Sequence, residues 1–387
     1  GDAYGRALGV APDHPAALAG AGAIALLHNQ LDAAVDWLGR AVERAPDDVR
    51  AMQHLAEAAY RRDDFAAGAA WRRRLATVVD GDDRHDVEVV ARKLEAFGAS
   101  APYEIRWPAP EVRVPMVATD PLPVLEVTLG GSTVPFFLDT GAEQVYLDQA
   151  LAASLQVATF GETAQQGAGG KQGTTVHGRL DALTIGGLPV RNLPVKILDF
   201  RALGFPESWM GTIGTGFLRH FRSTIDYPGG TLVLRPRSGP DAPTGDHTVP
   251  FWLAGTHYVL VEARINNGEP VLLFADTGGT GVALYATNDT VERARIPLRH
   301  DLASRGTGAA GAVRTVPFVV DELSVGDITG HDLPGVATPD SDPASTLQQD
   351  GLVERAYRIG GFVSHQFFRP YAVTLDFDRM HLSLRTA

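Results

Sequence analysis

Apolar residues follow two different periods along this chain of 387 residues. Up to about residue 98 they recur at helical spacing, in segments rich in Ala, Leu, Arg and Asp. Beyond about residue 115 they form short runs bounded by Gly and Pro, which is typical of β-strands. The sequence therefore predicts an α+β protein in which a helical part precedes a β-rich part.

The helical part repeats itself with a period of 34 residues. The matched positions are Ala11-Pro12-Asp13 with Ala45-Pro46-Asp47, Trp37 with Trp71, and Arg40 with Arg74. This pattern resembles the tetratricopeptide repeat, whose helix pairs stack side by side. The resemblance implies a helical repeat domain over residues 1–98. Residues 1–10 would be the second helix of a preceding repeat, and Val87–Phe97 a terminal helix.

Two interpretations of these repeats remain open. They could offer a concave groove to a peptide partner, or they could dock on the rest of the chain. Because at least three repeats are usually needed for an independent array, docking is favoured.

An acidic cluster at the end of the helical part lacks the spacing of a calcium loop, and we expect it to cap a helix that begins near Asp86 or Val87. Its members are Asp80, Asp82, Asp83 and Asp86.

The triplet Asp-Thr-Gly occurs twice in the β-rich part, at Asp139–Gly141 and Asp276–Gly278. Each copy follows an apolar run that is typical of a buried strand, Pro135–Leu138 before the first and Val271–Ala275 before the second. A single triplet would be read as a tight turn, in which Asp binds backbone amides and Gly takes a positive φ. Two copies in matching surroundings instead indicate a duplication.

Later segments match as well. Gly211–Arg219 aligns with Gly361–Arg369, and Thr224–Tyr227 aligns with Thr374–Phe377, both at an offset of 150 residues. The triplets are offset by 137, so the second copy has 13 more residues between its triplet and its glycine motif. The extra residues are expected within Asp332–Asp350. The region after about residue 115 is therefore predicted to be an internal duplication.

These motifs resemble the pepsin and retropepsin superfamily of aspartic peptidases, in which each lobe supplies one Asp-Thr/Ser-Gly loop and a later hydrophobic-hydrophobic-Gly motif. The resemblance spans roughly residues 115–387. It implies two retropepsin-like β-barrel lobes in tandem, related by a pseudo-twofold axis. The predicted boundaries are 1–98 for the helical domain, 99–115 for a proline-rich linker, and 116–238 and 239–387 for the two lobes.

The resemblance makes Asp139 and Asp276 the catalytic residues of an aspartic endopeptidase. Two carboxylates a few ångströms apart cannot both ionise, so the pair shares one proton. The ionised carboxylate can take a proton from a water molecule that attacks the peptide carbonyl, while the protonated one hydrogen-bonds the carbonyl oxygen. This chemistry implies no cofactor and no metal.

The rest of each triplet is expected to support the catalytic loops. Glycine lets the two backbones approach closely, and the threonine hydroxyls suit hydrogen bonds between lobes; these residues are Thr140, Gly141, Thr277 and Gly278. Two residues depart from the family pattern. Ser364 replaces the glycine found at Gly214 in the first copy, and Gly279 stands where the first copy has Ala142. They are the sequence support for an alternative, a catalytically inactive pseudo-peptidase that binds a peptide or protein partner.

Glycine-rich segments lie where this superfamily has flaps, the hairpins that cover the substrate. The candidate flap residues are Gly167, Gly169 and Gly170 in the first copy and Gly306 and Gly308 in the second. A β-rich run, Val313–Val320, follows the second segment and would form its returning strand. Glycines at a hairpin tip permit opening and closing, but an ordinary surface hairpin has the same composition.

Composition excludes several other classes. The net charge is −12, there is no Cys, and the twelve His residues include no His-Glu-x-x-His motif. The sequence therefore does not support a nucleic-acid partner, an anionic membrane surface, a zinc hydrolase or a cysteine nucleophile. No apolar stretch approaches the length needed for membrane insertion. We expect a peptide or protein substrate, with a peptide partner on the helical repeats as a further candidate.

The compartment is only weakly constrained by the sequence. Absence of Cys suits a reducing cytoplasm, but it equally suits a secreted protein that is stabilised by its core alone. The chain begins with Gly inside a repeat, which favours removal of an N-terminal segment such as a signal peptide. We therefore expect a periplasmic or secreted protein, with the cytoplasm as the alternative.

Overall fold

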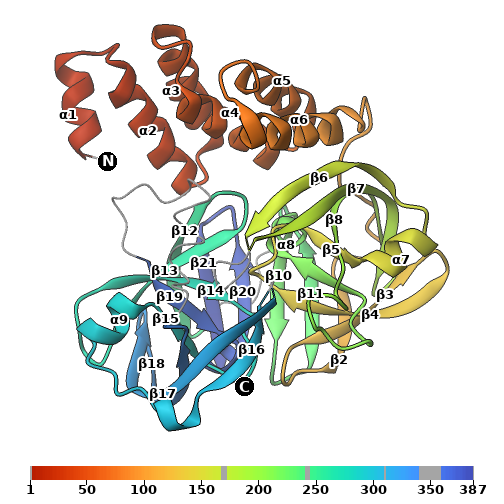
Figure 1. Cartoon of the computed structure of the whole chain (residues 1–387), viewed down its shortest axis with the longest axis vertical. Coiled ribbons are helices and arrows are strands. Elements are labelled where there is room, and N and C mark those ends of the chain that lie inside the picture. Colours follow the sequence, from red (N-terminus) through yellow and green to blue (C-terminus); the bar gives the residue numbers. More distant parts are fainter. Residues whose placement is uncertain (1, 167–171, 240–244, 309–310, 340–358, 387) are drawn as a thin grey trace.

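Helices form the first part of the chain and strands form most of the rest. The computed structural model describes residues 2–166, 172–239, 245–308, 311–339 and 359–386 (Figure 1). The helical part consists of α1 (Asp2–Val10), α2 (Pro15–Leu27), α3 (Leu31–Arg44), α4 (Val49–Arg61), α5 (Phe65–Leu75) and α6 (Gly81–Glu95). These helices lie in a row along one side of the β-rich part (Figure 1). No helix within the described ranges is long and apolar enough to cross a membrane.

Local sequence signals explain where these helices start and how they pack. Asp48 accepts a hydrogen bond from the Ala51 amide at the start of α4, which satisfies an otherwise unpaired donor. Small residues let neighbouring helices approach, since a Cβ atom on Gly22 of α2 would lie only 2.4 Å from Leu38 Cγ of α3. Residues one period apart also make matching contacts. Arg40 donates to the Pro12 carbonyl and stacks on Trp37, while Arg74 donates to the Pro46 carbonyl and stacks on Trp71.

The last helix begins earlier than the sequence predicted. α6 starts at Gly81 and carries Asp82 and Asp83 in its first turn, whereas a start near Asp86 or Val87 was expected. Carboxylates interact favourably with the positive end of the helix dipole, so acidic residues belong inside the first turn as well as before it.

The described residues contain no group of three or more His, Cys, Asp or Glu arranged to hold a metal ion.

We call the two successive sets of strands the first lobe and the second lobe. The first lobe contains β1 (Glu104–Ile105), β2 (Val112–Ala118), β3 (Val124–Leu129), β4 (Ser132–Asp139), β5 (Val145–Asp148), β6 (Ala158–Gln166), β7 (Gln172–Ile185), β8 (Leu188–Leu198), β9 (Gly211–Gly214), β10 (Phe221–Asp226) and β11 (Thr231–Pro236), with short helices α7 (Gln149–Ser154) and α8 (Thr215–Leu218).

The second lobe contains β12 (His247–Ala254), β13 (Tyr258–Ile265), β14 (Val271–Asp276), β15 (Leu284–Ala286), β16 (Ser304–Gly308), β17 (Gly311–Val325), β18 (Ile328–Ala337), β19 (Ile359–Ser364), β20 (Tyr371–Asp376) and β21 (His381–Thr386), with α9 (Asn288–Arg293), a 3₁₀ turn (His300–Leu302) and α11 (His365–Phe368).

The strands of the two lobes pair in the same order. β4 is parallel to β9 and β14 is parallel to β19. β5 is parallel to β8 and antiparallel to β9, and β15 has the same relations to β18 and β19. Consecutive apolar residues run into each triplet because the ends of β4 and β14 are buried on both faces, as Phe136–Leu138 and Leu273–Ala275 are.

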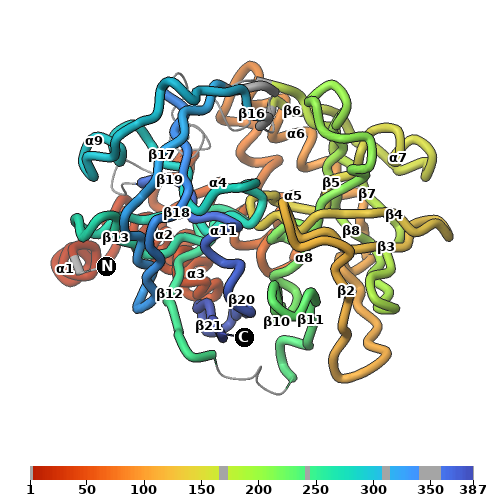
Figure 2. The backbone as a smooth tube through the Cα atoms, turned by 90° about the horizontal axis from the view of Figure 1, so that it is seen from below, coloured from red at the N-terminus to blue at the C-terminus, as the bar shows by residue number. Residues whose placement is uncertain are grey.

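A sheet shared by both lobes joins them (Figure 2). β10 and β20 pair antiparallel at its centre, and β11 and β21 flank them. Thr224 lies opposite Thr374, with 2.8 Å between their hydroxyl oxygens. The apolar side chains beneath this sheet form one continuous core that includes residues of both lobes. The lobes are thus parts of a single packed unit.

The segment predicted as a proline-rich linker is partly built into the first lobe. β1 pairs with β8, and β2, which begins within residues 99–115, pairs with β11 and β3. Tyr103, Val112 and Val114 are buried. Proline tolerates edge strands, so the density of Pro in this segment did not exclude pairing. Residues of this segment therefore contribute to the core of the first lobe.

Part of the extra length of the second lobe lies directly after its triplet. Tyr146 in β5 follows Asp139 by seven residues, whereas Tyr285 in β15 follows Asp276 by nine, and both tyrosines occupy the same place in the strand pairing. The sequence placed the extra residues within Asp332–Asp350, and residues 340–350 lie outside the described part of the chain.

The helical part is fastened to both lobes through buried arginines. Arg61, the last residue of α4, donates to the carbonyls of Leu26 in α2 (2.7 Å) and Leu253 in β12 (2.9 Å). Arg219, which follows α8, donates to the Arg61 carbonyl (2.8 Å) and to Asp63 (2.6 Å). These bonds tie the end of one helix to both halves of the β-rich part.

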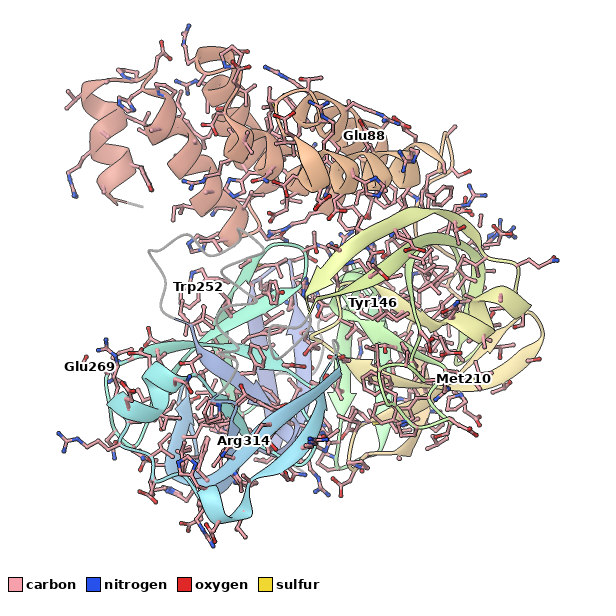
Figure 3. All side chains as sticks on the ribbon, in the orientation of Figure 1. Glu88, Tyr146, Met210, Trp252, Glu269 and Arg314 are labelled. Carbon is pink, nitrogen blue, oxygen red and sulfur yellow. The ribbon has the colours of Figure 1, made fainter. Side chains whose placement is uncertain are left out.

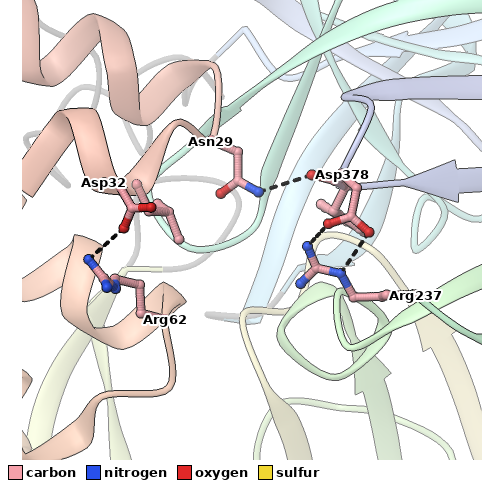
Figure 4. Close-up of a pocket in the computed structure, with 7 residues that line it drawn as sticks. Asn29, Asp32, Arg62, Arg237 and Asp378 are labelled. Carbon is pink, nitrogen blue, oxygen red and sulfur yellow. Dashed lines mark hydrogen bonds and ion pairs between the residues drawn. The ribbon is translucent and has the colours of Figure 1, made fainter.

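Further contacts extend this junction. Trp252 of β12, labelled in Figure 3, belongs to an apolar cluster that also includes Leu27 of α2. Nearby, a polar pocket of about 270 Å³ lies between the helical part and the end of the shared sheet (Figure 4). Asn29 crosses it to donate to the Phe377 carbonyl at 3.0 Å, and its walls carry the ion pairs Arg62–Asp32 and Arg237–Asp378. Each charged side chain in this pocket already has a partner of opposite charge.

Candidate active site

The two Asp-Thr-Gly triplets meet between the lobes. Asp139 is the last residue of β4 and Asp276 is the last residue of β14, so both strands deliver a carboxylate to the same place. Each carboxylate accepts a hydrogen bond from the glycine amide of its own triplet, at 2.8 Å in both lobes. The two carboxyl groups also hydrogen-bond each other. The structure thus brings together the two aspartates that the sequence selected.

Glycine is required beside each carboxylate because the opposite triplet lies so close. A Cβ atom on Gly278 would stand 2.3 Å from Asp139 Oδ1, and one on Gly141 would stand 2.8 Å from Asp276 Oδ1. Both distances are too short for a carbon that is not bonded to the oxygen. Any other residue at these positions would push the two carboxyl groups apart.

The threonines bind the two loops to each other through reciprocal hydrogen bonds. Thr140 Oγ1 donates to the Ala275 carbonyl (2.7 Å) and accepts from the Thr277 amide (2.9 Å). Thr277 Oγ1 donates to the Leu138 carbonyl (3.2 Å) and accepts from the Thr140 amide (3.0 Å). Both threonines are buried, so no water competes for these bonds. The cross-lobe bonds expected from the sequence are present.

Burial and mutual repulsion set the protonation of the pair. Burial raises the pKa of Asp139 well above its ordinary value, and the neighbouring charge of Asp276 raises it further. Burial also raises the pKa of Asp276, although hydrogen bonds from the Gly278 amide and Asp139 oppose the rise. Because the two carboxyl groups interact so closely, the raised pKa belongs to the pair, which shares one proton. The arrangement is a half-buried carboxyl pair that keeps one proton in mild acid.

Two segments of the chain match the sequence model of the aspartyl protease family. They are residues 125–218, which include Asp139, and residues 261–353, which include Asp276. The first match runs from β3 to the end of α8, and the second begins in β13, the corresponding strand of the second lobe. No protein with a curated description matches the chain. The family match therefore falls on each lobe separately and contains one Asp-Thr-Gly triplet in each.

The two departures from the family pattern compensate each other. In the first lobe Gly214 packs against the backbone, where a Cβ atom would lie 2.3 Å from the Ala142 carbonyl oxygen. In the second lobe the position of Gly214 is taken by Ser364, whose hydroxyl donates to the Asp276 carbonyl (2.6 Å) and lies 3.1 Å from the Gly279 carbonyl oxygen. A Cβ atom on Gly279 would lie 2.1 Å from that hydroxyl. Ser364 therefore fits because residue 279 is glycine, and its hydroxyl supports the loop that carries Asp276.

Gly279→Ala is expected to lower the free energy of unfolding by about 1–3 kcal/mol, because its methyl group would overlap the Ser364 hydroxyl. Adding Ser364→Gly should recover at least about 1 kcal/mol relative to the sum of the two single changes. Urea unfolding of the four proteins measures this coupling. Gly39→Ala is the matched control, since a Cβ atom there meets nothing within 4 Å and should slightly stabilise α3. Additive effects of the two changes would show that the residues do not compensate.

Of the two candidate flaps, the structure describes the second more fully. β16 and β17 form an antiparallel hairpin in which Gly306 lies opposite Val313 and Gly308 lies opposite Gly311. The predicted returning strand, Val313–Val320, is confirmed as part of β17. In the first lobe β6 and β7 form the corresponding hairpin. Gly167, Gly169 and Gly170 lie outside the described residues.

A buried polar cluster directly follows the first triplet, and sequence reasoning did not find it. Lys196 Nζ of β8 lies 2.5 Å from Glu143 Oε2, and Lys93 Nζ of α6 lies 2.6 Å from Gln144 Oε1. Lys93 is 1% exposed, which is rare for a lysine. A lysine placed among the apolar positions of α6 was the only signal present, and it does not identify a partner 51 residues away.

Proposed function

We propose that this chain is an aspartic endopeptidase that hydrolyses peptide bonds with a water molecule activated between Asp139 and Asp276. The observation that carries the proposal is the contact between the two half-buried carboxyl groups, whose loops are held by reciprocal threonine hydrogen bonds. The match of both lobes to the aspartyl protease family supports it. The compensated pair Gly279 and Ser364 preserves this geometry, which weighs against an inactive scaffold.

The singly protonated pair supplies both groups that the reaction needs. The ionised carboxyl group would remove a proton from the water molecule as the water oxygen attacks the peptide carbonyl carbon. The protonated carboxyl group would donate a hydrogen bond to the carbonyl oxygen and stabilise the charge that develops there. A proton then passes to the leaving amine, and the pair returns to its singly protonated state.

We also infer that the two lobes are retropepsin-like units related by a pseudo-twofold axis. Their identical order of strand pairing supports this, as does the antiparallel β10–β20 pair with Thr224 opposite Thr374 at its centre. An extended peptide would bind between the lobes as an added strand, with its side chains directed alternately into pockets on either side.

We infer further that the helical part is a short tetratricopeptide-like array whose role is to dock on the lobes. The matching contacts of Arg40 and Arg74, one period apart, support the repeat. The buried bonds of Arg61 and Arg219 support docking rather than an array that stands apart.

The proposal predicts cleavage of a diverse peptide library that depends on pH. The intact chain should cleave best in mild acid, where the pair holds one proton. Because the pKa of Asp139 is raised, activity should persist above the ordinary range of an aspartate and then fall as the pair loses its last proton. Mass spectrometry of the products between about pH 3 and about pH 8 measures the profile. A folded protein that cleaves nothing across this range would contradict the proposal.

A further inference from the structure

Three parts of the chain converge on the residues that follow the first triplet. Lys93 of α6 donates from Nζ to Gln144 Oε1 at 2.6 Å and to the Val195 carbonyl at 3.1 Å. Lys196 of β8 lies 2.5 Å from Glu143, and Thr256 of the second lobe donates to the same carboxylate at 3.2 Å. Glu143 and Gln144 are therefore bonded by the helical part, the first lobe and the second lobe together.

These residues are connected to the strand beside Asp139. The Thr215 amide donates to the Ala142 carbonyl (2.9 Å), and the Gly216 amide donates to the Glu143 carbonyl (3.0 Å). Gly214 pairs with Asp139 and lies directly against this loop, since a Cβ atom on Gly214 would stand 2.4 Å from the Gln144 carbonyl oxygen. A shift of residues 142–144 would therefore move the backbone next to the catalytic carboxyl.

The two lobes differ at this point. Glu143 and Gln144 of the first lobe are largely or fully buried beneath α6 and the second lobe. At the corresponding place of the second lobe stand Val282 and Ala283, since the Gln366 amide bonds the Val282 carbonyl as the Gly216 amide bonds that of Glu143. These two residues are also buried, but their side chains are apolar and accept no bond. The first catalytic loop is thus held from outside its own lobe, and the holding group belongs to a domain that has no part in the bond-breaking chemistry.

We propose that Lys93 is a positioning residue for hydrolysis: through Gln144, the helical part holds the loop after Asp139 so that Asp139 stays in contact with Asp276. The proposal rests on the function proposed above. It makes the helical part a component of the catalytic unit. The side chain reaches no reacting atom, so its effect is on geometry alone.

The charges around Lys93 are consistent with this role. Burial of the ammonium group lowers the pKa of Lys93 to about 7, although the charge of Glu143 opposes the change. Lys196 and Arg72 also face it and lower its pKa, while His177 packs nearby with a pKa lowered by its own burial. In mild acid, where the carboxyl pair is expected to act, Lys93 carries its proton and can donate to both of its acceptors.

Three variants test the proposal in the full chain. Lys93→Met keeps most of the side-chain volume but removes the donor, and Gln144→Leu removes the acceptor. Arg84→Met is the matched control, because Arg84 lies on the exposed face of the same helix and is paired with Asp80. Each protein is assayed for kcat and KM on one peptide, for its thermal midpoint, and for hydrogen exchange of the amides of residues 142–147.

We expect Lys93→Met to lower kcat by about tenfold or more, with KM changed less than about twofold, since a small displacement of a catalytic group costs rate rather than binding. Amides 142–147 should exchange faster. Gln144→Leu should have the same effects, and the double variant should be no worse than either, because both changes remove one interaction. Arg84→Met should leave every value unchanged.

The alternatives give different results. Unchanged kcat and unchanged exchange in a folded Lys93→Met protein would overturn the proposal, and so would additive losses in the double variant. A lower thermal midpoint with normal kcat would show a structural role only and would also overturn it. If Lys93→Met does not fold, Gln144→Leu decides the matter alone, since it leaves Lys93 bonded to Val195. A wild-type chain without activity would refute the proposed function, while exchange still reports whether Lys93 holds the loop.

Discussion

Asp276→Asn is expected to lower kcat/KM for peptide hydrolysis by about three orders of magnitude or more, with the fold intact. Asparagine has nearly the shape of aspartate, and its side-chain oxygen can still accept from the Gly278 amide. It cannot take a proton from water, so the attacking nucleophile is no longer generated. Initial rates on the best library peptide, together with the thermal unfolding midpoint, measure both parts of the prediction.

Two comparisons make this result specific. Asp139→Asn should cause a similar loss, and the double variant should be no worse than either single change, because the two carboxyl groups act as one unit. Asp181→Asn is the control, since the Asp181 side chain is 86% exposed. Its strand, β7, does not pair with β4 or β14, the strands that carry Asp139 and Asp276. Hydrolysis that survives Asp276→Asn would mean that another group activates the water.

Arg61→Met is expected to lower the free energy of unfolding by about 3–5 kcal/mol, although Arg61 lies far from the triplets in sequence. Its side chain is 2% exposed and bonds the carbonyls of Leu26, Leu253 and Gly255 as well as Glu57. Methionine fills the space but leaves these acceptors and the Glu57 carboxylate buried without a donor. Urea unfolding followed by far-ultraviolet circular dichroism gives the free energy.

The adjacent residue provides the control for this prediction. Arg62 is 42% exposed and pairs with Asp32, which is 92% exposed. Arg62→Met should therefore cost less than about 1 kcal/mol. Equal losses for the two variants would show that the buried bonds of Arg61 contribute no more than a surface ion pair, and that apolar packing alone holds the helices on the lobes.

The features that could be predicted from the sequence are those that belong to repeated motifs. Asp139 and Asp276 can be paired from the sequence alone, because each follows an apolar run and precedes a matching later segment, Gly211–Arg219 or Gly361–Arg369. Gly141 and Gly278 were selected for the same reason, and the structure shows the close approach that requires them. The 34-residue period of the helical part likewise marked Arg40 and Arg74 as equivalent.

The features that the sequence did not reveal depend on contacts between distant segments. The bond from Arg61 to Leu253 joins residues 192 positions apart, and that from Lys93 to Gln144 joins residues 51 apart. Nothing in the local pattern of either arginine or lysine specifies its acceptor. The start of α6 was misplaced because aspartate suits both a cap and a first turn, and the strands within 99–115 were missed because proline is frequent in linkers and on edge strands alike.

The shared β10–β20 pair has a consequence for how the protein reaches its native state. Thr224 and Thr374 stand 150 residues apart in the chain, yet they face each other at the centre of one sheet. Contacts of such long sequence separation form slowly, because a long loop must close before any bond repays its entropy. During synthesis the first lobe emerges without the strand that completes its sheet, and it exposes the unpaired edge of β10 until the second lobe follows. The two aspartates can therefore meet only after the second lobe has been made, so under the proposed mechanism a half-made chain has no peptidase activity.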